Sequence, residues 1–489
     1  MQLPHGGILK GALESGIAVY RGVRYAQRPF GKLRFERPAP VPAWVGVVPA
    51  LEFAPASPQA PRESGSLMFG GEDCLALNIW VPEESGEGCE LPVMVWVPGG
   101  AYMRGDAAEP VYDGAAFARQ GIVFVSVNYR VGIDGFMTVP GATPNRGLLD
   151  LVAALEWIQQ CIKAFGGDAS RITLAGGSAG GGAIACLMGM PIARGFFQRA
   201  ILQSPSVAVH TAAEADVAAA AIAGLLDVPM TKEALSAVSL PSAVAAVKRL
   251  ADDLVLRKQF GFNTRNFFPL RAVVDGEVLK AVPLQGMASS WQQWPPDFSV
   301  LVGCNRDEMR LYAVPTGLIE QTTEDGVKEF ASDVGLPEEG ISLYAEDPVT
   351  HAQRTPGETL CAMQSDYFYR IPARKIARDA STVGVTAYLY EFSWPSQRFE
   401  GRLGAAHGLE IPFVFNQLVS AAGAEITGPG APPALAQAMH EAWVRYVKQG
   451  DPGWLPHSSS SDGLMQFAAQ SRFETSDWNF RGSTWPRLL

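Results

Sequence analysis

The sequence predicts an α/β protein whose centre is a mostly parallel, twisted sheet with helices on both faces. Two apolar, β-branched runs at residues 93–97 and 122–127 lack the alternation of half-exposed strands, so we expect both faces of these strands to be covered. Residues 148–163 place apolar side chains at helical spacing after these runs. Strands that alternate with helices need crossover connections, which join parallel strands.

Further elements follow in chain order. Residues 16–26 and 75–81 fit strands, and the sequence FGGD at residues 165–168 is a stop signal for the preceding helix. Later strands are expected at residues 171–175, 197–204, 299–305 and 386–392. The polar segment 457–463 is expected to be an exposed loop.

The chain after Ser204 has a different composition. Residues 210–258 are rich in alanine at helical spacing, with interruptions at Pro229 and Pro241. We therefore expect one domain over the whole chain, with a helical insertion at about 206–295 and further cap segments at about 310–385.

Composition and charge exclude several classes of partner. Hydrophobic residues make up 47% of the 489 residues and charged residues 18%, which suits a large interior. The net charge is −10, and no long run of Lys or Arg indicates binding to nucleic acid or to an anionic membrane. The apolar runs are too short to span a bilayer. The six cysteines form no paired CxxC motif and no export signal is recognisable, so we expect reduced thiols in a cytoplasmic protein.

The glycine-rich stretch LAGGSAGGGA at residues 174–183 lies between an expected strand and an expected helix. It lacks the lysine of a phosphate-binding loop, and a glycine match to a dinucleotide fingerprint is weak. Gly176, Ser178 and Gly180 instead fit G-x-S-x-G, the nucleophile elbow. Side chains two residues before and after the serine would clash in so sharp a turn, and the serine backbone is strained by roughly 1–3 kcal/mol.

The sequence resembles the type-B carboxylesterase family of the α/β-hydrolase fold, which includes cholinesterases and bacterial p-nitrobenzyl-type esterases. The likeness runs from about residue 15 to the end of the chain. It rests on blocks in family order, which are YRGVRYAQRP, GEDCLALNIWVP, VMVWVPGGAY, VNYRVGIDGF, NRGLLD, FGGD, GGSAGG, FQRAILQS, GCNRDE and AAHGLEIPFVF. The resemblance implies a serine carboxylesterase with helical insertions over its active site.

A serine nucleophile needs a base and an orienting acid. The histidines that compete for the base are His5, His210, His351, His407, His440 and His457. The resemblance selects His407, which begins the family motif HGxE. A carboxylate follows the expected strand 299–305, and the family pattern selects Glu308 over Asp307 as the acid.

Backbone donors are expected to stabilise the oxyanion of the tetrahedral intermediate. By resemblance these donors are the N–H groups of Gly100 and Ala101, in the loop PGGA, and of Ala179 beside the nucleophile. Ser204 matches a serine that packs behind the triad in relatives, but a strand-end hydroxyl explains it equally well, so we leave it outside the catalytic set.

Two positions depart from the family pattern. Pro98 stands where relatives commonly carry His or Tyr, so a side-chain hydrogen bond that braces the oxyanion loop is missing. Gly177 replaces the Glu that precedes the nucleophile in most relatives. We hypothesise that without this carboxylate the base loses its proton at a lower pH than in relatives and that acylation is slower.

The leading expectation is a hydrolase of apolar or aromatic esters with short to medium acyl chains, which works through an acyl-enzyme. No cofactor or metal is expected, because no His/Cys/Asp cluster has ligand spacing. An amidase, a carbamate hydrolase or an acyltransferase on the same triad stays open, as does a non-catalytic binding protein. The oligomeric state is left open.

Overall fold

The computed structural model describes residues 1–4, 6–61, 66, 68–83, 85–259, 268–348, 350–458, 462–475 and 485. Among these residues the chain contains an eleven-stranded mixed sheet and numerous helices, so the predicted α/β class is confirmed. The chain divides into two compact units, Met1–Ile201 with Ala208–Pro295 and Leu202–Val207 with Pro296–Leu489. The expected single-domain organisation stays a prediction.

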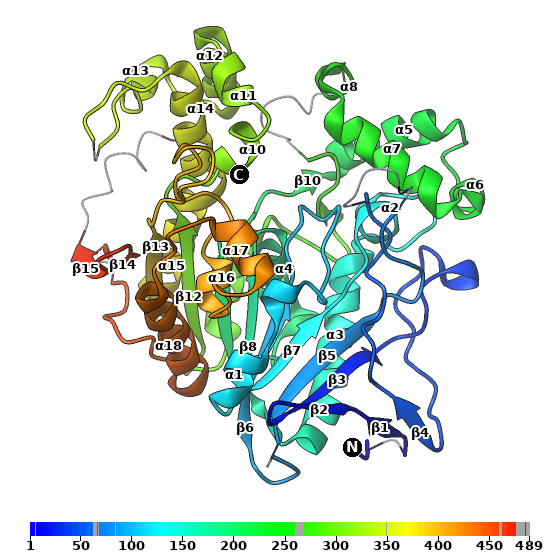
Figure 1. Cartoon of the computed structure of the whole chain (residues 1–489). Helices are drawn as coiled ribbons and strands as arrows, with labels where there is room; N and C mark the ends of the chain where they lie inside the picture. Colours follow the sequence, from blue (N-terminus) through cyan, green and yellow to red (C-terminus); the bar gives the residue numbers. More distant parts are fainter. Residues whose placement is uncertain are drawn as a thin grey trace. The chain divides into compact units, whose positions relative to one another are not determined.

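The sheet strands of the first unit comprise a parallel group, which antiparallel strands extend on one side (Figure 1). Their order along the sheet is β8 (Gly167–Gly177), β6 (Leu91–Val97), β7 (Val123–Val127), β5 (Ala76–Pro82), β3 (Ile17–Arg24) and β2 (Ala12–Glu14). β6 pairs in parallel with both β7 and β8, whereas β5, β3 and β2 are added in antiparallel. Every residue of β7 is buried, as the absence of alternation predicts.

The first unit also contains two short sheets, β1 (Ile8–Lys10) with β4 (Val47–Pro49) and β10 (His210–Thr211) with β11 (Val273–Val274). Its α-helices are α1 (Ala115–Arg119), α2 (Gly132–Phe136), α3 (Arg146–Cys161), α4 (Ala179–Gly189), α5 (Ala212–Leu226), α6 (Lys232–Ala237), α7 (Leu240–Asp252), α8 (Leu254–Gln259) and α9 (Pro283–Ser290). Pro229 falls between α5 and α6, and Pro241 lies in the first turn of α7, where its missing N–H is tolerated.

The second unit has its own set of parallel strands. β12 (Ser299–Asn305), β13 (Thr386–Phe392) and β14 (Gly463–Phe467) are parallel, and β15 (Arg472–Thr475) is antiparallel to β14. Its α-helices are α10 (Arg310–Ala313), α11 (Leu318–Gln321), α12 (Glu324–Val334), α13 (Glu338–Ser342), α14 (Pro356–Ser365), α15 (Ile371–Thr382), α16 (Ile411–Val414), α17 (Ala421–Thr427) and α18 (Pro433–Gln449). A π-helical turn, Asp366–Arg370, joins α14 to α15. β9 (Arg199–Gln203) begins in the first unit and ends in the second.

The expectation of an exposed loop at residues 457–463 is wrong at its ends. Residues 459–461 lie outside the described residues, but His457 is buried and Gly463 begins β14. The His457 ring interacts with the Asp462 carboxylate at 3.1 Å and with the Ser381 hydroxyl at 3.2 Å. These partners satisfy the polar ring, so polar composition alone is a poor guide to exposure here.

No helix within the described ranges is long and apolar enough to cross a membrane.

Candidate active site

Ser178 lies at a sharp turn between β8 and α4 in the first unit. β8 ends at Gly177 and α4 begins at Ala179, so the serine is the single residue between strand and helix. Its backbone has φ 56° and ψ −123°, a conformation that residues with a side chain rarely adopt. Such strain costs about 1–3 kcal/mol and persists where the surrounding structure holds it in place.

The positions of the glycines on either side of the turn have no room for a side chain. A Cβ atom on Gly176 would lie 2.9 Å from the carbonyl carbon of Gly180, and one on Gly180 would lie 2.1 Å from the Val97 carbonyl oxygen. The predicted clash two residues before and after the serine is therefore confirmed. These glycines let β8, α4 and the end of β6 approach one another closely.

The loop after β6 lies directly against the serine. A Cβ atom on Gly99 would lie 2.7 Å from the Gly177 carbonyl oxygen and 2.9 Å from Ser178 Cβ. Gly100 has φ 126°, and Ala101 follows with φ 57°, which is unusual for a residue with a side chain. The candidate oxyanion residues Gly100, Ala101 and Ala179 thus belong to the same unit and the same neighbourhood as Ser178.

The candidate oxyanion loop is held by hydrogen bonds from other segments, although the Pro98 side chain cannot form one. The Tyr129 hydroxyl donates to the Pro98 carbonyl at 3.0 Å. Gln59 accepts from the Gly105 N–H at 3.0 Å and donates to the Gly105 carbonyl at 2.9 Å. Residues from other segments therefore hold both ends of the loop.

Glu308 and His407 form a hydrogen-bonded pair in the second unit. Glu308 is fully buried, and its Oε2 lies 2.5 Å from His407 Nδ1. Its Oε1 accepts from the Asn305 N–H at 2.7 Å and from the Ser204 hydroxyl at 2.6 Å. Because both carboxylate oxygens are held, the imidazole ring has a defined orientation.

The second ring nitrogen of His407 is available for chemistry. Nε2 is buried and has no hydrogen-bond partner among the described residues. With Nδ1–H donated to Glu308, Nε2 carries the lone pair of the neutral ring. The pair thus presents a proton acceptor at the end opposite to the carboxylate.

Asp307, the other candidate acid, is engaged elsewhere. Its carboxylate accepts from the Ala405 N–H at 2.9 Å and interacts with the guanidinium groups of Arg306 and Arg310. Burial raises its pKa, but these two cations and the Ala405 hydrogen bond outweigh burial, so the pKa lies below its usual value. The residue therefore ties the loop of Glu308 to the loop of His407.

The chain is similar to known proteins over most of its length. Residues 3–476 match the model of the carboxylesterase family. The chain belongs to that family. It is 33% identical over 462 residues to the para-nitrobenzyl esterase of Bacillus subtilis, which covers 91% of this chain and 89% of that protein. It is 32% identical over 461 residues to the phenmedipham hydrolase of Pseudarthrobacter oxydans, again with 91% and 89% covered.

Solved structures of carboxylesterases show the same fold. The crystal structure of the Geobacillus stearothermophilus carboxylesterase at pH 6.2 superposes with a TM-score of 0.84 at 28% identity and covers 98% of both chains. A PNB esterase structure gives a TM-score of 0.78 at 28% identity and covers 98% of this chain and 97% of that one. The predicted α/β-hydrolase fold is thereby confirmed, and this chain is a carboxylesterase-family hydrolase.

The structure of this carboxylesterase also brings out polar groups that sequence reasoning did not single out. Glu410, the last residue of the motif HGLE, is buried and accepts from the Asn305 amide at 2.6 Å and from the Gln203 amide at 3.0 Å. The Asn305 amide also donates to the Ala406 carbonyl at 2.7 Å. Asn305 belongs to the motif NRDE and Glu410 to the motif HGLE. The sequence contains both motifs, but only the fold shows that these two residues lie together.

Electrostatics around His407 favour its charged form. Burial lowers the pKa of the imidazole, but the charge and hydrogen bond of Glu308, with a further contribution from Glu410, outweigh burial and raise it above its ordinary value of 6.5. Burial and the Glu308 charge together raise the pKa of Glu410 itself. A protonated His407 is therefore stabilised.

Arg370, in the π-helical turn, anchors the loop that carries Glu308. Its guanidinium donates to the Arg306 carbonyl at 2.7 Å and to Glu391 Oε2 at 3.0 Å, and it also pairs with Asp366. The preceding residue, Tyr369, places its ring centroid 4.7 Å from that of His407. The π-turn thus contacts His407 and the loop that carries Glu308, in keeping with the frequent occurrence of such turns at functional sites.

Replacing Arg370 by Met should destabilise the protein by about 3–5 kcal/mol, because buried carboxylates lose their counter-charge. The loop of Glu308 loses a donor at the same time, so kcat should fall more than KM rises. Urea denaturation and steady-state kinetics measure the two effects. The exposed Arg378, on α15, provides the control, since Arg378→Met should change stability by less than about 0.5 kcal/mol. Equal stability of the two variants would contradict the anchoring role.

The other histidines have different surroundings. His210 is buried in β10, His351 is exposed beside Glu346, and His440 Nδ1 lies 2.9 Å from the Val414 carbonyl oxygen. His457 pairs with Asp462, as described above, and His5 lies outside the described residues.

The candidate residues thus fall into two groups, Ser178 with the candidate oxyanion loop in the first unit and Glu308 with His407 in the second. Within the described ranges no group of three or more His, Cys, Asp or Glu side chains could hold a metal ion.

Proposed function

We propose that the protein is a serine carboxylesterase in which Ser178 is the nucleophile, His407 the general base and Glu308 the orienting acid. The observation that carries this proposal is the His407 ring, which is held by Glu308 through Nδ1 and keeps a buried Nε2 without a hydrogen-bond partner in the described part of the chain. Ser178 supports it, because its strained turn is the conformation of a nucleophile elbow. Membership of the carboxylesterase family supplies the reaction class.

The proposed reaction has two halves. Ser178 Oγ attacks the ester carbonyl carbon while His407 Nε2 takes the hydroxyl proton, and the resulting imidazolium is stabilised by Glu308. The imidazolium then gives this proton to the leaving alcohol, which leaves an acyl group on Ser178. In the second half His407 takes a proton from water as the water attacks the acyl carbon. The imidazolium then returns that proton to Ser178 Oγ as the bond between Oγ and the acyl carbon breaks, and the free acid leaves.

The oxyanion of each tetrahedral intermediate is proposed to accept hydrogen bonds from the backbone N–H groups of Gly100, Ala101 and Ala179. Such donors contribute about 3–4 kcal/mol each to lowering the barrier. The closeness of Gly99 to Ser178 supports this role, because a Cβ atom on Gly99 would lie 2.9 Å from Ser178 Cβ.

The substrates are proposed to be apolar or aromatic esters with short to medium acyl chains, in the cytoplasm. The test is a panel of p-nitrophenyl and benzoate esters of increasing acyl length, each compared with the matched amide. Hydrolysis of the esters well above the amides supports the proposal. Preference for the amides would replace it by an amidase, the alternative that the same residues permit.

The pH profile should show the state of His407. Only the neutral ring accepts a proton, so kcat/KM should fall as pH falls through the pKa of His407, which lies above 6.5. Gly177→Glu should move this acid limb to higher pH by adding a carboxylate near the ring, whereas the uncharged Gly177→Gln should not. If Glu at this position leaves the acid limb in place, its proposed proximity to the base is wrong.

A further inference from the structure

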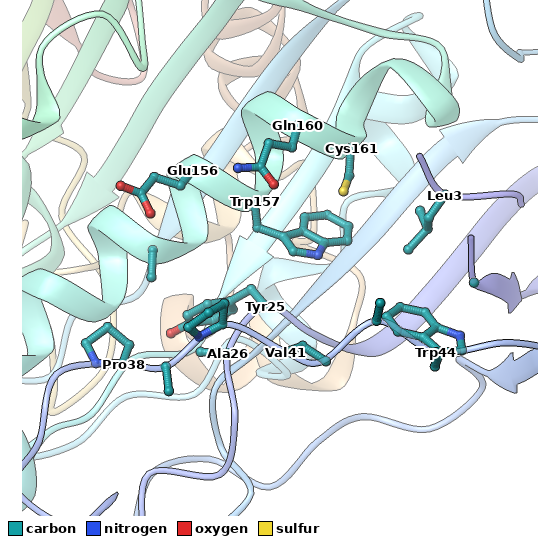
Figure 2. Close-up of a pocket in the computed structure, with 15 residues that line it drawn as sticks. Leu3, Tyr25, Ala26, Pro38, Val41, Trp44, Glu156, Trp157, Gln160 and Cys161 are labelled. Carbon is teal, nitrogen blue, oxygen red and sulfur yellow. The ribbon is translucent and has the colours of Figure 1, made fainter. Parts of the chain in front are cut away.

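The first unit contains a cavity that none of the proposed catalytic residues lines. Its volume is about 420 Å³, within the range of small-molecule sites. Its walls come from Leu3 and Gly7, from residues within 25–44 and from residues within 153–161, that is, from the N-terminal segment and from the C-terminal half of α3 (Figure 2).

Aromatic rings form much of the wall. Figure 2 shows Trp157 pointing from α3 toward the segment that holds Tyr25 and Val41, with Trp44 on the same side of the cavity as Val41. The rings are held in place by other contacts. The Tyr25 hydroxyl donates to the Asn128 carbonyl at 2.7 Å, and a Cβ atom on Gly7 would lie only 2.0 Å from the Trp44 ring. The cavity is therefore largely preformed.

One charged residue lies at the edge of this apolar space. Glu156 is the only charged residue among the described residues that line the cavity. It precedes Trp157 on α3 and lies one turn before Gln160, so these two polar side chains share a face of the helix at the cavity. Glu156 is exposed and forms no ion pair with any residue in the described part of the chain.

We propose that this cavity is a second binding site, which takes an apolar organic cation such as an aromatic or alkyl ammonium. The faces of Trp157, Tyr25 and Trp44 attract a cation through their ring quadrupoles and cover its apolar groups. Glu156 supplies the opposite charge at the edge. An organic anion is disfavoured, because Glu156 repels it and the described lining contains no Lys or Arg.

The cavity binds a ligand and does not carry out a second reaction. Cys161 is its one nucleophilic thiol among the described lining residues, and burial raises the pKa of this thiol to about 11. At neutral pH the thiol is therefore protonated and a poor nucleophile. No serine or histidine is among the described residues of the wall.

The test is a ligand-observed NMR titration of the whole protein with phenyltrimethylammonium and with tert-butylbenzene, its uncharged analogue of the same shape. The variants are Glu156→Gln, Trp157→Leu and, as a control that removes one exposed charge from α18, Glu441→Gln. Circular dichroism checks that each variant is folded, and p-nitrophenyl acetate hydrolysis is followed in parallel.

We expect saturable binding of the cation with one site, and an affinity for the hydrocarbon at least about tenfold weaker. Glu156→Gln and Trp157→Leu should each weaken the cation about tenfold, while Glu441→Gln should not. No saturable binding, equal affinity for cation and hydrocarbon, or unchanged affinity in Glu156→Gln would each overturn the proposal. Ester hydrolysis should be unchanged in Glu156→Gln. A failure of the proposed cation site can therefore be distinguished from a failure of the proposed esterase function.

Discussion

Replacing Ser178 by Ala should lower kcat for ester hydrolysis by roughly four to six orders of magnitude. The variant lacks the only group proposed to form the acyl-enzyme, and what remains is stabilisation by the oxyanion loop. Alanine keeps the Cβ atom, so the strained turn and its contact with Gly99 are preserved and the fold should be intact. The measurement is kcat on p-nitrophenyl acetate with protein whose thermal midpoint matches the wild type.

Ser170 provides the matched control for this experiment. It lies on β8 and is exposed, and its hydroxyl donates to Asp168 at 2.7 Å. Ser170→Ala removes the same hydroxyl group from the strand that leads to Ser178 and should leave kcat within about twofold of the wild type. If Ser178→Ala retains more than a few per cent of the wild-type rate, the nucleophile has been assigned wrongly.

Replacing Glu308 by Gln should reduce kcat by about ten-thousandfold. The carboxylate oxygens accept from Asn305, Ser204 and the His407 Nδ1–H, and an amide cannot accept at both ends. If the amide NH₂ group faces His407, the ring must carry its proton on Nε2 and can no longer act as a base. The imidazolium also loses its counter-charge, so the acid limb of the residual activity should move to lower pH.

The variant Asp307→Asn is the control that distinguishes a loss of catalysis from a loss of structure. Asp307→Asn removes a charge from the same loop and weakens the contact with Ala405, so it should lower stability. Its kcat should nevertheless stay within about tenfold of the wild type, because the pair of Glu308 and His407 is left in place. Similar losses of kcat in Glu308→Gln and Asp307→Asn would contradict the assignment of the acid.

Local sequence pattern was sufficient to predict much of the fold and the sharp turn at Ser178. The strands at residues 93–97 and 122–127 were predictable because strands buried on both faces consist almost wholly of apolar residues. Gly176 and Gly180 were predictable because only a residue without a Cβ fits beside the end of β6. These features depend on neighbours within a few residues along the chain or on the strand next to it.

Features that depend on distant residues were not predictable in this way. The contact of Ser204 with Glu308 joins residues 104 positions apart, and that of Gln203 with Glu410 joins residues 207 apart. β14 was missed because it is a short strand that directly follows a polar segment. The aromatic cavity beside Trp157 is formed by two stretches more than 100 residues apart, whose aromatic residues look like ordinary core positions in the sequence.

The most direct test of the account is to identify the atom that carries the acyl group. p-Nitrophenyl acetate is mixed with the enzyme, the reaction is quenched in acid within milliseconds, and the peptides are analysed by mass spectrometry. The account predicts an added acetyl group on Ser178 that is absent from His407→Ala, because an alcohol without its base is not acylated. An acetyl group on another residue, or hydrolysis without any covalent intermediate at Ser178, would contradict it.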